Sequence, residues 1–475
     1  QTDYECFECC FSYFCLSMNQ MVSYIENFKN VKYGQVVLKN NRKDYKASIL
    51  GIYGQNGSGK TALIDAIKLL KLAFCGQVIP PQFADYIHVE AEYAKLKFDI
   101  SMKIPEKELE YLVNYEFKIR KVLSTQQNFS EAESYKVDLF DEVLSFSYTD
   151  KNTKHKMVDL INTDSKEVFS PKSKYVELVG KDKEVATNLE VVKRLALATS
   201  RSFIFSGELL STIDNKCHQT IYTDLFQVIV QYGNSELFVI DTQNNGLITL
   251  NALPVTFMYE SGNSRASGNI MLSLDEPSTI PEEAAELIKK MIPNMNKVLS
   301  QLVPGLTIDV YDFGKQFLQN GSVGRRVQLI SKKNHEDIPL RYESEGIKKI
   351  ISILQLLIYM YNNSYITVVI DELDSGIFEY LLGEILKIIS EKGQGQLIFT
   401  SHNLRPLETL DKSFIVFTTT NPNNRYIRLT NVKENNNLRN FYYRDIVLGG
   451  QDEVVYDPTN NYEIALAFRE AGKMQ

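Results

Sequence analysis

The sequence lacks any long apolar run. Its longest strongly apolar stretch, Ile350 to Tyr361, is too short to cross a bilayer, since a membrane helix needs about 20 apolar residues. The first residues carry acidic side chains where a secretory signal carries basic ones, so we expect neither a signal peptide nor a membrane partner. Free thiols without an export signal favour a cytoplasmic location.

The sequence also lacks an excess of basic residues, internal repeats and sustained heptads. The formal net charge is −7 and the pI is about 5.5, which excludes attraction of the whole molecule to nucleic acid but leaves a local basic face open. Without heptads or a fixed period, a long coiled coil and a repeat architecture are excluded.

Cysteine is scarce after the first residues. Four of the six cysteines are Cys6, Cys9, Cys10 and Cys15. The Cys6–Cys9 spacing is half of a zinc site, but no second CxxC and no nearby histidine completes it. This favours a reduced, hydrophobic N-terminal extension over residues 1–17, of unassigned role.

The 475 residues exceed what one compact core usually serves, so we expect two lobes. Buried strands are predicted over Ala47 to Tyr53, Ile366 to Ile370 and Gln396 to Thr400, and helices over Thr61 to Phe74 and Glu345 to Tyr361. Strand, helix and strand in this order indicate an α/β fold with a parallel sheet and crossover helices.

A glycine-rich loop follows the first of these strands. Its residues fit G-x-x-x-x-G-K-[ST] at every fixed position, and they are Gly54, Gln55, Asn56, Gly57, Ser58, Gly59, Lys60 and Thr61. The glycines allow backbone N–H groups to turn into one cavity, and the helix that follows directs its positive end at the phosphates. Lys60 is expected to contact the β- and γ-phosphates of ATP, and Thr61 to ligate Mg²⁺.

Two acids end the strand at residues 366–370, and a histidine ends the strand at residues 396–400. Asp371 is expected to hold Mg²⁺ through water, and Glu372 to orient or deprotonate the attacking water. Asp374 follows in the same turn, and His402 is expected to contact the γ-phosphate. Upstream, Ser344 is expected to cap a helix with the Gly346 N–H exposed beside it.

This order of motifs resembles the ABC ATPase head shared by SMC, Rad50, RecF and OLD (overcoming lysogenization defect) ATPases. The resemblance covers about residues 22–120 and 305–430. It implies an ABC-type P-loop ATPase head, a mixed sheet with flanking helices, and a mainly helical insertion lobe. The halves of the head would be residues 18–150 and 305–475, and the insertion lobe residues 151–304.

The resemblance also implies roles in a head-to-head dimer in which ATP lies between two subunits. Glu372 is then the catalytic base, Asp371 the metal-binding acid, Asp374 the dimer-contact aspartate and His402 the switch histidine. The loop residues from Gly54 to Thr61 bind nucleotide and Mg²⁺. Ser344 and Gly346 act on the partner's nucleotide.

Of three further motifs of this family, one is present, one is altered and one has only weak candidates in this sequence. Asn27-Phe28-Lys29 resembles the Asn-Phe-Lys/Arg segment of these heads and implies that Lys29 lies near nucleotide. The signature here is Ser-Glu-Gly-Ile-Lys-Lys from Ser344, where transporter heads have Ser-Gly-Gly-Gln. Gln77 and Gln82 are weak candidates for the glutamine loop.

The spacing narrows the branch of the family. Thr61 and Ser344 are 283 residues apart (344 − 61), more than in transporter heads, and no heptads of the SMC or Rad50 kind fill the interval. Only 73 residues follow His402 (475 − 402), too few for the Toprim nuclease domain of OLD proteins. The chain resembles stand-alone ATPase subunits of bacterial phage-defence systems of the PARIS, Septu and AbiL types.

Two functions remain open after a transporter head is set aside. The first is an ATPase that dimerises, or forms a larger oligomer, and controls a separate nuclease-like effector encoded nearby. The second is a RecF- or Rad50-like repair ATPase that clamps DNA. Arg325-Arg326 and Lys332-Lys333 are candidates for a basic DNA stripe, or else they form a solvated strand edge.

Overall fold

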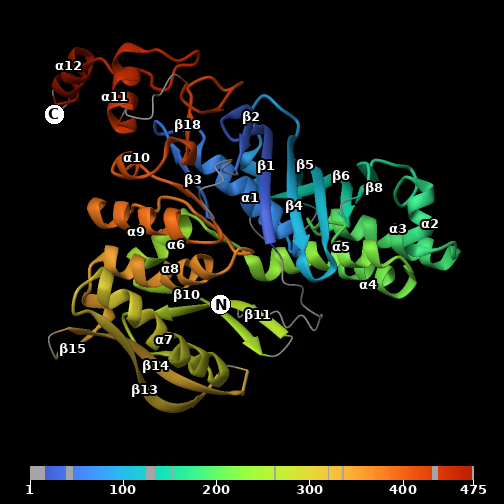
Figure 1. Ribbon diagram of the computed structural model, residues 1–475, viewed down its shortest axis with the longest axis horizontal. Coiled ribbons are helices and arrows are strands. Elements are labelled where there is room, and N and C mark those ends of the chain that lie inside the picture. The colour runs from blue at the N-terminus through green and yellow to red at the C-terminus, as the bar shows by residue number, and fades with distance from the viewer. Residues whose placement is uncertain are drawn as a thin grey trace.

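The computed structural model describes residues 17–38, 47–124, 134–151, 153–261, 264–318, 320–333, 336–430 and 437–472 (Figure 1). Cys6 and Cys9, whose spacing is half of a zinc site, lie outside these residues. Within the described ranges, no helix combines the length and the apolar character that crossing a membrane requires.

An antiparallel sheet forms the N-terminal part of the fold. Its strand order is β2-β1-β4-β5-β6-β7, and β8 also pairs with β6. The strands are β1 (Ser17–Phe28), β2 (Val31–Val37), β4 (Ala94–Ile104), β5 (Leu109–Leu123), β6 (Tyr135–Asp150), β7 (Thr153–Lys154) and β8 (Val158–Asn162). Burial alternates along β4 and β5, as expected for a sheet with one face on the core.

A six-stranded sheet forms the centre of the molecule, in the order β19-β18-β3-β17-β16-β9. Its strands are β3 (Ser48–Tyr53), β9 (Leu237–Ile240), β16 (Thr367–Ile370), β17 (Gln396–Thr400), β18 (Ile415–Thr418) and β19 (Tyr426–Ile427). All neighbours pair in parallel except β18 and β19. Strands buried on both faces explain the continuous apolar runs in the sequence.

Helix α1 (Lys60–Phe74) connects these two sheets. It lies between them in Figure 1, and most of its side chains are buried, which explains why apolar residues surround its axis instead of lining one stripe. The helix begins directly at the glycine-rich loop that follows β3. The core therefore holds the loop at a fixed place in the fold.

The range 151–304 does not form a single separate lobe. Strand β9, in the middle of that range, pairs in parallel with β16 and is the outer strand of the central sheet. Long-range pairing of a four-residue strand leaves no signal in local periodicity. The rest of the range is mainly helical, as expected, with α2 (Lys172–Val179), α3 (Lys183–Ala198), α4 (Gly207–Lys216), α5 (Thr220–Gln231) and α6 (Thr242–Thr249).

A second lobe surrounds helix α8 (Glu345–Asn362). It contains the hairpin of β10 (Ala252–Ser261) and β11 (Ser264–Ser273), helix α7 (Glu282–Leu302) and a sheet of β12 (Ser278–Pro281), β13 (Thr307–Phe317), β14 (Val323–Lys333) and β15 (Glu336–Pro339). Helix α8 contacts β10, α7 and β16. It therefore joins this lobe to the central sheet.

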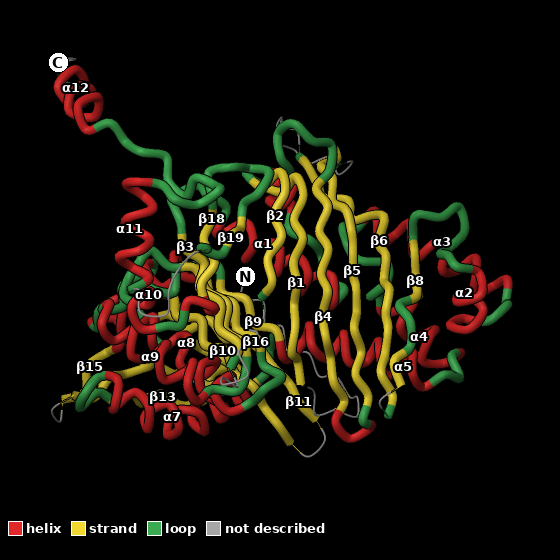
Figure 2. The backbone as a smooth tube through the Cα atoms, turned by 45° about the horizontal axis from the view of Figure 1, so that its top comes forward, coloured by secondary structure: helices red, strands yellow, loops and turns green. Residues whose placement is uncertain are grey.

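The C-terminal part covers the edge of the central sheet and then leaves the body. Helix α9 (Glu379–Lys392) connects β16 to β17, and α10 (Pro406–Thr409) and α11 (Leu438–Leu448) follow. Helix α12 (Asn461–Ala471) stands apart from the rest of the chain in Figure 2. Short 3-10 turns lie at η1 (Pro81–Tyr86), η2 (Pro105–Lys107), η4 (Leu340–Tyr342) and η5 (Lys412–Phe414), and a π turn at η3 (Tyr232–Glu236).

Parallel strands bring their carboxyl ends to one edge of a sheet, where ligands bind in open α/β folds. Here β3 leads into the glycine-rich loop, β16 into Asp371 and β17 into Ser401 and His402. The predicted ABC-type P-loop ATPase fold, with its mixed sheet and flanking helices, is confirmed.

Candidate functional site

The glycine-rich loop has a backbone that only glycine fits at its first position. Gly54 has a φ of 155°, and a Cβ added there would lie 1.8 Å from the Thr418 hydroxyl oxygen. Gly57 and Gly59 also have positive φ, of 75° and 98°. A Cβ at Gly57 would meet no atom within 4 Å, so the loop is open on that side. The loop thus presents its backbone to an open space, as phosphate binding requires.

The Lys60 side chain folds back over this loop. Its Nζ donates hydrogen bonds to the carbonyl oxygens of Gly54 at 2.9 Å and Gln55 at 3.0 Å. Burial lowers the pKa of Lys60, while the nearby acids Asp371 and Glu372 act to raise it. A buried ammonium bonded only to carbonyls is placed to exchange them for phosphate oxygens.

Residues from the C-terminal half of the chain form hydrogen bonds with the glycine-rich loop. The Thr418 hydroxyl bonds to Ser58, and the Tyr426 hydroxyl donates to the Gly59 carbonyl at 2.8 Å. Arg425 donates to the Thr419 carbonyl at 2.6 Å and to the Asn30 carbonyl at 2.7 Å. No motif in the sequence indicates these residues, because their contacts with Ser58, Gly59 and Asn30 join positions 360 or more apart.

The turn between β1 and β2 lies on the other side of the loop. The residues Lys32-Tyr33-Gly34 predict a turn between two short strands, but pairing of Phe28 with Val31 places the turn at Lys29-Asn30, so that prediction is wrong. The Asn30 amide donates to the Gly57 carbonyl. Lys29 forms an ion pair with Asp65, on α1, and its Nζ lies 3.9 Å from the centre of the Tyr86 ring. Lys29 therefore lies beside the first turns of α1.

The two acids after β16 have different environments. Asp371 is fully buried, and the Thr400 hydroxyl donates to its Oδ1. The Glu372 N–H donates to the same hydroxyl at 2.8 Å. Glu372 has a φ of 49°, a left-handed backbone that is rare outside glycine and concentrates at functional sites. Thr400, which the sequence did not single out, fixes both acids at the edge of the sheet.

Asp374 lies in the turn after β16 that carries Asp371 and Glu372, which we call the acid turn. It links this turn to the residues that follow β17 in the same chain. Its Oδ2 accepts hydrogen bonds from the N–H groups of His402, at 3.1 Å, and Asn403, at 2.9 Å. Its Oδ1 has no hydrogen-bond partner among the described residues. The His402 side chain is exposed. Asp374 thus positions the backbone of His402 and keeps one oxygen for a further partner.

Ser344 and Gly346 begin helix α8, and they differ in exposure. Ser344 is exposed and caps the helix, with its hydroxyl accepting from the Ile347 N–H at 3.3 Å. Gly346 is buried, so the expectation of an exposed Gly346 N–H is wrong. A Cβ there would lie 2.0 Å from the carbonyl oxygen of Gly376, in the acid turn of the same chain. Close packing of two backbones requires this glycine.

Lys349 lies one turn further along α8 and is buried. Burial lowers its pKa to about 8, against the opposite effect of Glu372, Asp371 and Asp374. The ammonium therefore lies in the field of these carboxylates. The spacing of Lys349 from the signature serine is visible in the sequence, but its direction toward the acids is not.

A cavity of 360 Å³ opens between the glycine-rich loop and the histidine turn. Gln55 and Asn56 line one wall, and Ser401 and His402 another. The remaining walls come from the C-terminal part and include Tyr442, Ile446 and Tyr456. The predicted loop and histidine residues therefore share one space, whereas Ser344 is not among the residues that line it.

Neither weak candidate for the glutamine loop lies at this edge. Gln77 follows the far end of α1, and Gln82 is exposed in η1. Asp241 instead follows β9, beside Asp371, whose N–H donates to the Ile240 carbonyl at 2.8 Å. Asp241 caps α6 and pairs with Lys68 of α1. Sequence reasoning missed it because β9 lies inside the range expected as an insertion.

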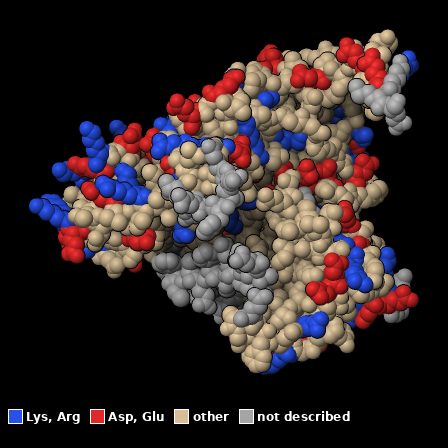
Figure 3. Space-filling model, turned by 180° about the vertical axis from the view of Figure 1, so that it is seen from behind, with Lys and Arg blue, Asp and Glu red and all other residues tan. Residues whose placement is uncertain are grey.

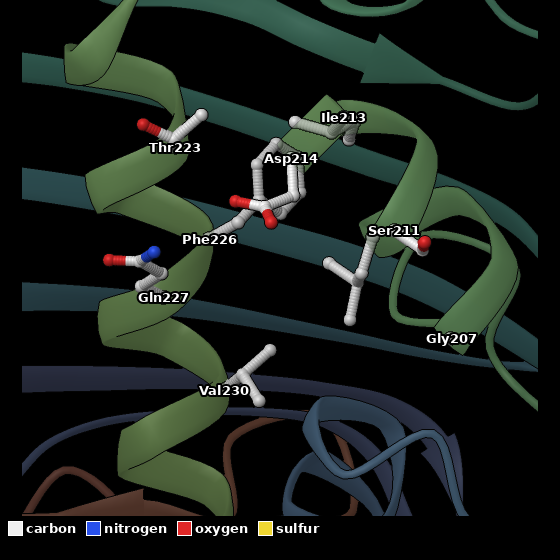
Figure 4. A pocket seen from close by; sticks show the side chains of 9 residues that line it. Gly207, Ser211, Ile213, Asp214, Thr223, Phe226, Gln227 and Val230 are labelled. Carbon is white, nitrogen blue, oxygen red and sulfur yellow. The ribbon is translucent and has the colours of Figure 1, made fainter. Parts of the chain in front are cut away.

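A second cavity of 350 Å³ lies between α4 and α5 (Figure 4). Its walls are largely apolar, with Leu210, Ile213, Phe226 and Val230, and the exposed Asp214 also lines it. None of the site residues predicted from the sequence lines this cavity. It is therefore separate from the candidate nucleotide site.

The basic residues proposed for a DNA stripe are in part neutralised. Arg325 forms ion pairs with Glu282, at 3.0 Å, and Asp312, at 2.8 Å. Lys332 pairs with Asp309 at 2.7 Å. On the face in Figure 3, basic and acidic side chains are interspersed. This favours the interpretation of a solvated strand edge.

Comparison with known proteins identifies the family. The family model described as AAA ATPase domain matches residues 23–405, which is most of the chain. No curated protein matches. Solved structures that match include an Smc head bound to the C-terminal winged-helix domain of ScpA, an Smc head with an extended coiled coil bound to the ScpA C-terminal domain, from Pyrococcus furiosus, and the SMC head domain from Thermotoga maritima.

The sequence identities and TM-scores of these structural matches are low. Identities are 11%, 12% and 15%, and TM-scores are 0.39, 0.36 and 0.36, in the same order. The matches cover 87% of this chain and 98%, 96% and 99% of the others. Scores this low carry no argument on their own. The family match and the arrangement of the loop, the acids and the histidine show that the chain belongs to the AAA ATPase domain family and is an ATPase.

Proposed function

We propose that this protein binds and hydrolyses ATP as an ABC-type head that dimerises head to head around the nucleotide. The observation that carries the proposal is the convergence at one sheet edge of Lys60, the Asp371–Glu372 pair and His402. The open Gly57 side of the loop provides the entry for a triphosphate. ATP is the substrate.

The residues present also fit Mg²⁺. Asp371 is buried at the end of β16 and Thr61 lies in the first turn of α1, so a carboxylate and a hydroxyl lie where a triphosphate-bound ion is usually held. Both would hold the ion, Asp371 through water. Mg²⁺ supplies charge neutralisation on the β- and γ-phosphates. Burial lowers the pKa of both Lys60 and Lys349, and the nearby acids oppose that lowering, so negative charge is concentrated where the ion would bind.

Three side chains would act on the reaction. Glu372 accepts the proton of the attacking water, and it has the left-handed backbone that concentrates at functional sites. Lys60 exchanges its bonds with Gly54 and Gln55 for phosphate oxygens. His402 lines the same cavity as Gln55 and Asn56, where it can contact the γ-phosphate.

The second subunit would complete the site. Ser344 is exposed at the N-terminus of α8, where the helix dipole and free N–H groups favour an anion. It does not line the cavity of its own loop and histidine. A partner's γ-phosphate is the ligand that this end of α8 would bind, so Ser344, with Gly346 beneath it, would act in trans. Asp374 would be the dimer-contact aspartate that the resemblance implies; its Oδ1 is buried and accepts no hydrogen bond from the described residues of its own chain.

We also propose that the ATPase acts as a sensor and scaffold for a separate effector in antiphage defence, with a nuclease-like partner encoded nearby. Support for this finer role comes from the resemblance and from the compact range between α1 and α8. The DNA-clamping alternative is disfavoured by the ion pairs of Arg325 and Lys332. Co-purification with the product of a neighbouring gene would test the effector role.

Glu372→Gln tests the central proposal. The amide keeps the shape of the side chain but cannot accept the proton, so hydrolysis should fall about 100-fold or more while ATP still binds. The ATP-bound variant should accumulate as a dimer in light scattering, and Lys60→Ala should stay monomeric under the same conditions. A Glu372→Gln protein that hydrolyses ATP at the wild-type rate, or stays monomeric with saturating ATP, would contradict the proposal.

A further inference from the structure

Lys349 is a buried lysine that the proposed mechanism does not use. It is 3% exposed and lies in α8, five residues after Ser344. Placing an ammonium in a protein interior costs free energy unless opposite charges compensate it. An apolar side chain would fill the same space without that cost. The charge of Lys349, and not only its volume, therefore has a role at this place.

The start of α8 directs Lys349 toward the acid turn. The backbone of Gly346 packs against Gly376 of that turn, where a Cβ on Gly346 would lie 2.0 Å from the Gly376 carbonyl oxygen. Lys349 follows Gly346 by three residues, which places it on the same side of the helix, one turn further along. The same helix contacts β16, the strand that ends at Asp371. The side of α8 that carries Lys349 therefore faces the segment that carries the acids.

The acid turn concentrates negative charge in front of this lysine. Three of its side chains are carboxylates, and they are Asp371, Glu372 and Asp374. Asp371 is fully buried, so water does not screen its charge. Burial lowers the pKa of Lys349 to about 8, against the opposite effect of the three acids. At pH 7 the lysine is an ammonium, which offers the acids a positive charge from inside the same subunit.

Lys60 lies in the field of the same three acids, but its surroundings differ. It folds over the glycine-rich loop and bonds to the carbonyl oxygens of Gly54 and Gln55, where phosphate would replace them. Lys349 is not among the residues that line the cavity beside this loop, and its burial keeps it from the partner's surface. It is therefore not placed to contact a phosphate, and it stays with the acids when Lys60 turns to the nucleotide.

We propose that Lys349 is a positioning residue that acts as a tethered cation for the acid turn. Its ammonium balances Asp371 and Glu372 in the nucleotide-free subunit, holds them in place, and keeps a divalent cation from binding there without ATP. The phosphates of ATP supply the negative charge that allows Mg²⁺ to bind beside the lysine. This role rests on the proposed function, in which Asp371 holds Mg²⁺ and Glu372 is the base.

The first test measures metal binding by the nucleotide-free full chain at pH 7, with Mn²⁺ as a probe that electron paramagnetic resonance detects. Lys349→Met removes the charge and keeps an unbranched side chain, so Mn²⁺ should bind about tenfold or more tightly than to the wild type. Lys348→Met is the matched control, because Lys348 is also buried in α8 but donates to the Asn251 side-chain oxygen at 3.1 Å. It should leave Mn²⁺ affinity within about twofold of the wild type. Equal Mn²⁺ affinity in the two variants would overturn the proposal.

The second test measures the interaction of Lys349 with the acids by urea unfolding. Lys349→Met leaves the acids without this cation and should lower the urea midpoint. The loss should be about half as large or smaller in a Glu372→Gln background, which lacks the carboxylate with the largest effect on Lys349. If Lys349→Met alone does not fold, the double variant should fold. Equal losses in the two backgrounds, or a double variant that stays unfolded, would overturn the proposal.

Both tests use the protein without nucleotide, so their outcome is separate from hydrolysis and from dimerisation. If Lys349→Met and Lys348→Met bind Mn²⁺ alike while Glu372→Gln still accumulates as an ATP dimer, the tethered cation is refuted alone. If Glu372→Gln hydrolyses ATP at the wild-type rate, the proposed function is refuted whatever the metal affinity of the lysine variants.

Discussion

The glycine-rich loop and the start of helix α8 differ in how their polar groups are satisfied. Around the loop, Lys60, Ser58 and Gly59 bond to groups of the same chain, including residues from its C-terminal half. At the start of α8, Ser344 caps its own helix and is otherwise exposed. One half of the site is complete within a subunit, and the other half faces outward. The comparison indicates which substitutions should affect the subunit that carries them and which should show their effect only in the dimer.

Lys60→Ala should have the largest effect. It removes the ammonium that lies over the loop, so ATP affinity should fall about 100-fold or more, as expected for the main charge on the β- and γ-phosphates. Isothermal titration calorimetry measures the affinity, and Lys297→Ala, an exposed lysine of α7, is the matched control. ATP affinity equal to that of the control would refute the assignment of the loop.

Ser344→Arg should abolish hydrolysis and leave ATP binding by the monomer nearly intact, because the bulky charge blocks only the partner's site. Mixing it with the inactive Lys60→Ala should restore activity. Half of the randomly paired dimers are mixed, and each has one intact site of two, so about a quarter of wild-type activity should return. No recovery, with mixed dimers seen by native mass spectrometry, would contradict sites that fire independently across the interface.

Thr400→Val should have the smallest effect. It should affect only the half of the site that lies within one subunit. Loss of the hydroxyl leaves the Glu372 N–H and Asp371 without that shared partner, which should cost about 1–3 kcal/mol of unfolding free energy. Thr400→Ser keeps the hydroxyl and serves as the control in urea unfolding. Equal stability of the two variants would mean that the hydroxyl does not hold the acids.

The strands and motifs with strong local signals were predictable. The buried runs at residues 367–370 and 396–400 and the helix after the loop were found because apolar continuity and glycine spacing are local properties. The packing of Gly346 on Gly376 could not be found in this way. It depends on two segments meeting in space, and a glycine in a signature motif suggests exposure as readily as close packing.

Contacts distant in sequence account for the other gaps. Arg425 and Tyr426 support the loop, yet they lie at the start of the two-residue strand β19 with no motif around them. The apolar run of β9 predicts a strand, but its partner β16 lies about 130 positions away, so the sequence does not show its place at the site edge or the role of Asp241. The position of Lys29 near nucleotide and the dimer contact of Asp374 stay predictions.

The close contact of Gly346 with Gly376 has a consequence for communication between two ATP molecules. The start of α8 would sense the partner's phosphate, while Gly376 belongs to the turn that carries this subunit's own acids. With no side chain between the two backbones, a shift of one displaces the other, because packed interiors transmit strain. In a dimer the two turnovers would then be cooperative, and the hydrolysis rate would rise with ATP along a sigmoid.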